Sequence, residues 1–109
     1  METTEDVQML SFQIILHAGN ARSHAMEAIS YAKAYQFNEA RQKIEAADKE
    51  FNDAHHMQTK LLQEEADGKQ TDLSVILIHA QDHLMTAMTV KDLAVEMIDM
   101  YEKIQTLEG

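Results

Sequence analysis

The stretch Val75-Ile-Leu-Ile-His-Ala-Gln-Asp-His-Leu-Met-Thr-Ala-Met-Thr-Val90 decides how the rest of the chain is interpreted. It is apolar on nearly every side for about four helical turns, yet polar residues sit in its middle. They are His79, Gln81, Asp82 and His83. A helix that is apolar all round must be covered all round, and buried charges need partners. The polar cluster is therefore either a cost to folding or a functional feature.

The composition predicts an all-α protein. The chain has 109 residues, enough for a single domain (1–109) with a core of modest size. It lacks proline, has three glycines, and is rich in residues that favour helices. It has no cysteine, which excludes disulfides, thiolate catalysis and cysteine zinc sites. A net charge of -10 argues against nucleic-acid binding through phosphates.

The distribution of charge also predicts where the protein works. The first six residues carry acid where a secretory signal would carry positive charge, and no long uncharged apolar run follows. The segment from Val75 to Val90 contains Asp82 and two histidines, so no membrane insertion is expected. We expect a soluble cytoplasmic protein.

Apolar residues recur at helical spacing in three segments, which predict an antiparallel three-helix bundle at about 4–34, 38–66 and 72–106. Thr3, Asn38, and Asp72 or Ser74 are the expected N-caps, and Gly68 is expected to end the second helix. The inner stripe of the first helix is Val7, Leu10, Ile14, Ala18, Ala21, Ala25, Ala28 and Ala32. That of the second is Phe37, Ala40, Ile44, Ala47, Phe51, Ala54, Gln58 and Leu61. That of the third is Leu73, Ile76, Leu77, Ala80, Leu84, Ala87, Lys91, Ala94, Ile98, Tyr101 and Ile104.

The third segment carries a second, mostly apolar line, which indicates that copies of the chain associate. Its members are Val75, Ile78, Asp82, Met85 and Thr89. Three helices around one seam bury one face each, so this second line meets another protein surface or stays exposed. If Asp82 lay near a symmetry axis, like charges would converge there and would bind a cation or take up protons.

The pair His79 and His83 is spaced i, i+4 and shares one helical face, which leaves several interpretations open. A zinc or iron site would need further ligands from Asp82, His17, His24 or carboxylates on other helices. A phosphoryl carrier would need only one reachable neutral imidazole and hydrogen-bond donors, for which Gln81, His83 and Thr86 are candidates. From the residues alone, a core-facing histidine satisfied by hydrogen bonds is the best single interpretation of His79. We expect structural or surface roles for His17, His24, His55 and His56.

Three motifs carry a resemblance to a known family. They are His79-Ala-Gln-Asp-His-Leu-Met-Thr86, Gly19-Asn-Ala-Arg-Ser23 and Ala54-His-His-Met-Gln-Thr59. The chain resembles the lactose/cellobiose-type enzyme IIA of the bacterial phosphoenolpyruvate-dependent sugar phosphotransferase system over essentially its whole length. Alanine at position 80 resembles the cellobiose and chitobiose branch of the family, whereas glycine is expected there in the lactose branch.

The resemblance implies a phosphocarrier that assembles as a homotrimer of nine helices. His79 would accept a phosphoryl group from the carrier protein HPr and pass it to a cysteine of enzyme IIB. Gln81 and His83 would be neighbouring, orienting residues. Asp82 would contact one divalent metal per trimer at the threefold axis, and Mg²⁺ is expected at a carboxylate-rich site. A helical metal carrier and a coiled-coil interaction module using the same histidine cluster remain as alternatives.

Overall fold

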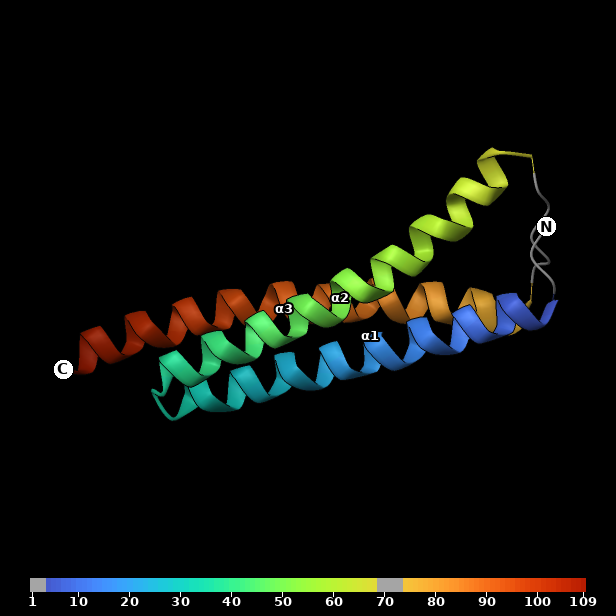
Figure 1. The fold of residues 1–109 in the computed structure, drawn as a ribbon. Coiled ribbons are helices and arrows are strands. Elements are labelled where there is room, and N and C mark those ends of the chain that lie inside the picture. The colour runs from blue at the N-terminus through green and yellow to red at the C-terminus, as the bar shows by residue number, and fades with distance from the viewer. Residues whose placement is uncertain (1–3, 69–73) are drawn as a thin grey trace.

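Three long helices make up nearly all of the described chain. The computed structural model describes residues 4–68 and 74–109. Helix α1 spans Thr4–Lys33, α2 spans Phe37–Ala66 and α3 spans Val75–Glu108. The described residues contain no strand. The helices run up, down and up as a rod of 59 × 20 × 18 Å, which confirms the predicted three-helix bundle (Figure 1).

The helix ends agree with the predictions at some positions and differ at others. α1 ends at Lys33, as expected, and Gly68 has the left-handed φ of 87° just beyond α2. Helix α3 begins at Val75 rather than at residue 72, because Ser74 is extended and its hydroxyl accepts a hydrogen bond from the Leu77 amide at 3.1 Å. The predicted cap Thr3 and the alternative cap Asp72 lie outside the described residues.

The predicted cap Asn38 is wrong, because α2 starts before it. Tyr35 adopts a left-handed φ of 61°, and the Gln36 amide donates to the Tyr31 carbonyl at 2.9 Å. This tight turn places Gln36 at the N-cap, and its carbonyl accepts from the Ala40 amide at 3.0 Å. Asn38 therefore lies inside the first turn of the helix.

Helix α1 is the centre of the bundle. It packs along both other helices, whereas α2 and α3 contact each other much less. The reason is its inner stripe, in which every residue from Ala18 onward is alanine and fully buried. Side chains this small let both neighbouring helices approach the backbone of α1 closely.

The inner stripes predicted for α1 and α2 are confirmed, and that of α3 is confirmed except at one end. The buried members on α3 are Leu77, Ala80, Leu84, Ala87, Ala94 and Ile98. Ile104 is instead exposed, because the last turns of α3 extend past the α1–α2 turn (Figure 1). Leu73 lies outside the described residues.

Polar side chains link the helices at the turn end of the rod. The Tyr35 hydroxyl donates to a Glu108 carboxylate oxygen at 2.7 Å, and this hydrogen bond is the main reason that the pKa of Tyr35 is raised. Arg41 on α2 pairs with Asp99 and Glu102 on α3, and nearer the middle of the rod Lys91 pairs with Asp48 at 3.0 Å. These pairs are largely exposed and contribute little to stability.

None of the helices in the described part of the chain combines the length and the apolar character needed to cross a membrane.

Because alanines fill most of the core, its few large side chains carry much of the stability. Leu84 is fully buried on α3, whereas Leu62 on α2 is 56% exposed. We expect Leu84→Ala to lower the free energy of unfolding by about 2–5 kcal/mol, since it leaves a cavity. Leu62→Ala is the matched control and should cost much less. Denaturant titration followed by circular dichroism measures both, and equal losses would contradict this account of the core.

Candidate functional site

The His79 side chain is exposed on the second turn of α3. Side chains on a helix lean towards its N-terminus, so the ring lies over the first turn of α3. Neither ring nitrogen of His79 has a hydrogen-bond partner among the described residues. Both nitrogens are therefore available to a molecule that approaches from outside the chain.

The structure brings His79 and His83 together. Their rings are stacked, with centroids 5.9 Å apart and planes inclined by 2°. His83 is half-buried and lies beside α1, where its Nε2 would be 3.6 Å from a Cβ placed on Gly19. His83 thus lies at the contact between α3 and α1, and the exposed His79 ring stacks on it.

The structure does not bring Gln81 to the His79 ring within one chain. Two residues correspond to about 200° around a helix, so the two side chains leave α3 in different directions. Gln81 instead faces α2, where its side-chain oxygen accepts a hydrogen bond from the Gln58 amide. Gln81 therefore helps to hold α3 against α2 next to the histidine pair.

Asp82 lies on the exposed face of α3 together with the second apolar line. Val75 is 85% exposed, Ile78 59% and Met85 56%. No ion pair or hydrogen bond to the Asp82 carboxylate occurs within the described ranges. An unpaired carboxylate between large exposed apolar side chains is the arrangement that the sequence predicted for this face.

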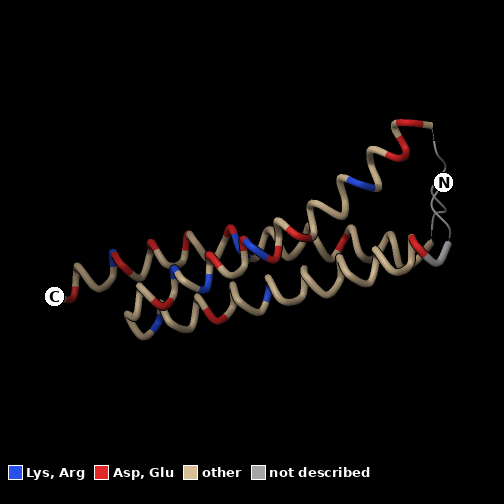
Figure 2. The backbone as a smooth tube through the Cα atoms, viewed as in Figure 1, with Lys and Arg blue, Asp and Glu red and all other residues tan. Residues whose placement is uncertain are grey.

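The segments of α1 and α3 near His79 carry almost no charge. No Asp, Glu, Lys or Arg occurs from Val7 to Ala21 on α1, and Asp82 is the single such residue from Val75 to Val90. Figure 2 shows both of these segments almost entirely in tan, at the end of the rod where α1 and α3 begin. Exposed apolar side chains of α1 lie on the same stretch: Met9, Phe12 and Leu16. This end is suited to contact with apolar protein surfaces.

The other histidines have different surroundings. His17 is partly buried, and its Nδ1 is hydrogen-bonded to a Glu50 carboxylate oxygen at 2.5 Å. His24 is 4.0 Å from Glu27, and no hydrogen bond reaches its Nδ1 from the described chain. His55 lines a hollow between α2 and α3, and His56 is exposed on α2.

A metal site built on His79 and His83 finds no support in the structure. Among the described residues, one group of side chains is close enough to hold a metal, and it consists of His17, Glu50 and Asp53. It contains neither member of the histidine pair. The ligands that the zinc or iron interpretation needed do not converge on His79.

Sequence reasoning missed several polar contacts. Ser11 is fully buried, and its hydroxyl donates to the Val7 carbonyl at 2.7 Å. The sequence pattern places Gln58 in the inner stripe of the second helix but does not indicate its hydrogen bond to Gln81. It also does not indicate the pairing of Glu50 with His17. Spacing along one helix cannot reveal contacts between helices, because these depend on how the helices are rotated against each other.

Comparisons with known proteins give one consistent result. The sequence model of the family described as "PTS system, Lactose/Cellobiose specific IIA subunit" matches residues 9–102. The lichenan-specific phosphotransferase enzyme IIA component of Bacillus subtilis is 53% identical over 105 residues, which cover 96% of each chain.

Solved structures agree with the sequence matches. The crystal structure of the cellobiose-specific enzyme IIA from Bacillus anthracis has a TM-score of 0.90 and 52% identity, covering 97% of this chain and 95% of that one. The Escherichia coli IIA(Chitobiose)–HPr complex contains a chain with a TM-score of 0.77 and 36% identity, covering 96% of this chain and 99% of that one.

The space beside Gly19 can be tested by adding a methyl group. A Cβ at this position would be in ordinary van der Waals contact with His83, so the fold does not need a glycine there. Because alanine favours helix more than glycine does, Gly19→Ala should raise the free energy of unfolding by up to about 1 kcal/mol. Denaturant titration measures the change, with Ser23→Ala, at an exposed site on the same helix, as the control. A loss of stability in Gly19→Ala would show that α1 and α3 are closer than described.

Proposed function

Because the chain belongs to the lactose/cellobiose-specific IIA family of the phosphotransferase system, we propose that it is a cytoplasmic phosphocarrier. In this proposal His79 accepts a phosphoryl group from HPr and passes it to a cysteine of enzyme IIB. The protein is a component of a phosphotransferase and does not act on the sugar. Support for HPr as the donor comes from the related chitobiose protein, whose solved structure is a complex with HPr.

One observation carries the proposal: His79 is exposed, and its ring nitrogens have no hydrogen-bond partner in the described residues, on a part of α3 that carries little charge. His56 is also exposed, but it lies on α2, in a segment that carries Asp53 and Lys60. A visiting protein must bring its own phosphohistidine within reach of the accepting ring. An accessible imidazole in apolar surroundings meets that requirement, whereas a ring already bonded to a carboxylate, such as that of His17, does not.

Phosphoryl transfer between two histidines needs few catalytic groups from the protein. The lone pair of a neutral ring nitrogen of His79 attacks phosphorus in line with the leaving nitrogen of the donor histidine. One phosphorus–nitrogen bond breaks while another forms, and the second ring nitrogen of His79 keeps its proton. A neutral imidazole is common at physiological pH, and the resulting phosphoramidate is readily transferred onward. Catalysis is then mainly positioning and stabilisation of charge on the phosphoryl oxygens.

The beginning of α3 supplies part of that stabilisation. The first turn of a helix presents free backbone amides and the positive end of the helix dipole, which favour an anion. The His79 side chain leans towards this turn, and the described first turn contains no acidic residue that would oppose a phosphoryl group. The amides of Leu77 and Ile78 are taken by Ser74, which leaves those of Val75 and Ile76.

His83 acts as a positioning residue in this scheme. Its stacked ring limits the directions in which the His79 side chain can turn, because His83 is itself packed against α1 beside Gly19. Restricting the accepting ring lowers the entropy that is lost when the donor docks. We assign Gln81 an indirect role, which is to fix α3 against α2 through Gln58.

We further propose that three chains associate through the exposed face of α3. That face continues beyond Met85 and Thr89 with residues spaced alternately by three and four, the pattern of a coiled-coil seam. These residues are Leu93, Met97, Met100, Ile104 and Leu107, and all are exposed in the single chain. Threefold association would cover the whole line and would bring three copies of Asp82 together.

A divalent cation, for which we propose Mg²⁺, fits the chemistry of that meeting point. Asp82 has no partner in the described part of the chain, so its charge is uncompensated within one subunit. Three carboxylates at one axis repel each other, and oxygen ligands of this kind prefer a hard cation. When bound, the ion would neutralise the Asp82 carboxylates and so stabilise the assembly.

Phosphorylation of the purified chain tests the carrier role. Incubation with phosphoenolpyruvate, enzyme I and HPr should add one acid-labile phosphoryl group per chain, measured by intact-protein mass spectrometry. We expect His79→Gln to abolish the addition, because it removes the nucleophile. His56→Gln is the control, since it changes another exposed histidine in the same way. An unmodified wild-type protein, or modification that survives in His79→Gln, would reject the proposal.

Chelation tests the axial cation. In protein prepared with Mg²⁺ as its only divalent cation, adding EDTA should lower the thermal unfolding temperature of the wild-type oligomer, because the Asp82 carboxylates lose their counter-ion. Asp82→Leu should form an oligomer that EDTA does not affect, since the repelling charges have been replaced by an apolar contact. Analytical ultracentrifugation with and without Mg²⁺ monitors the assembly. An unfolding temperature of the wild type that EDTA leaves unchanged would show that no cation stabilises the oligomer at its threefold axis.

A further inference from the structure

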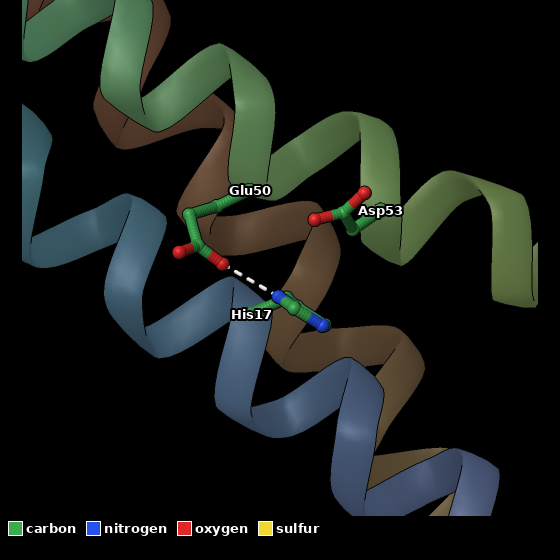
Figure 3. A group of neighbouring side chains, drawn as sticks. All are labelled: His17, Glu50 and Asp53. Atoms are coloured by element: carbon green, nitrogen blue, oxygen red, sulfur yellow. Dashed lines mark hydrogen bonds and ion pairs between the residues drawn. The ribbon is translucent and has the colours of Figure 1, made fainter.

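A second polar cluster lies on the opposite side of α1 from His83. It consists of His17 on α1 with Glu50 and Asp53 on α2, and one ligand atom of each lies within 4.8 Å of the others. Figure 3 shows the three side chains extending from the two helices towards one another. His17 and Gly19 are two residues apart, so His17 faces α2 while Gly19 faces α3. The cluster is therefore separate from the proposed phosphoryl site.

The charges of this cluster are poorly compensated. Glu50 and Asp53 are one turn apart on the same helix, which brings two carboxylates close together. No lysine or arginine within 4–68 or 74–109 forms an ion pair with either of them. The one opposing group is His17, whose Nδ1 is 2.5 Å from a Glu50 oxygen. A cation at this point would relieve the repulsion between the carboxylates.

We propose that His17, Glu50 and Asp53 form a binding site for a divalent cation of the zinc class. One imidazole nitrogen and two carboxylate oxygens are ligands that Zn²⁺ accepts, with water completing its coordination. Mg²⁺ suits the site poorly because it prefers oxygen ligands alone. Binding of the metal would replace the hydrogen bond between His17 Nδ1 and Glu50.

The site would join α1 to α2 at the middle of the rod. Its ligands come from two helices, so a bound ion cross-links them and stabilises the folded chain over the unfolded one. The ligand atoms are partly exposed, with 22% of the His17 side chain and 24% of the Glu50 side chain accessible, so an ion can enter from solvent. Neither the proposed phosphoryl transfer nor the axial cation uses these residues.

Titration of the metal-free full-length protein with Zn²⁺ tests the site, using isothermal titration calorimetry without any phosphodonor. We expect one Zn²⁺ per chain for the wild type and affinities lower by at least about tenfold for His17→Gln and Asp53→Asn. Zn²⁺ should also raise the unfolding temperature of the wild type but not that of Asp53→Asn. Because Asp53 is exposed, this variant should fold normally, which circular dichroism verifies.

A control separates this site from other histidines on the chain. His56→Gln removes a nearby exposed histidine and should bind Zn²⁺ like the wild type. Equal affinity in His17→Gln and the wild type, or no Zn²⁺ uptake by the wild type, would overturn the inference. Since no phosphoryl group is involved, these outcomes are independent of whether His79 is a phosphocarrier.

Discussion

The packing of small side chains along α1 is the constraint on which the rest of the structure depends. A stripe of fully buried alanines lets two helices approach the same backbone from different sides. Only a few large side chains, such as Ile14 and Leu84, fill the remaining space. Close approach places His83 against α1 on one side and Glu50 against His17 on the other. Both polar sites described above follow from this arrangement.

The scarcity of charge on the segments of α1 and α3 near His79 leaves the histidine pair with few charged neighbours on those two helices. A charged surface would attract water and fix the imidazole of His79 through ion pairs, as Glu50 does for His17. The surroundings of His79 offer the ring neither kind of partner within the described chain, so its nitrogens stay accessible. On the same stretch of α3, Val75 and Ile78 expose large apolar side chains, which suit contact with another protein surface.

Much of the fold could be predicted from the sequence. Periodicity identified three helices and nearly all of their buried residues, because spacing reports which side of a helix is apolar. It failed at Asn38, where the turn through Tyr35 rather than a capping side chain sets the start of α2. It also failed at Ile104, because periodicity does not reveal how far one helix extends past its neighbours.

The candidate site was predictable only in part. Motif resemblance pointed to His79, and the structure adds that its ring is exposed and stacked on His83. The position of Gln81 against Gln58 depends on the rotation of α3, which the sequence does not encode locally. Ala80, the residue that suggested one sugar branch over another, is fully buried. Its identity is therefore explained by helix packing, and it has no direct route to influence a sugar.

The central place of α1 makes the three helices unequal. Removing either outer helix from the bundle would leave a packed pair, whereas removing α1 would leave two helices with little shared surface. Synthesis on the ribosome runs from the N-terminus, so α1 emerges before α2 and α3. The surface that both later helices need is therefore already present when each of them leaves the exit tunnel.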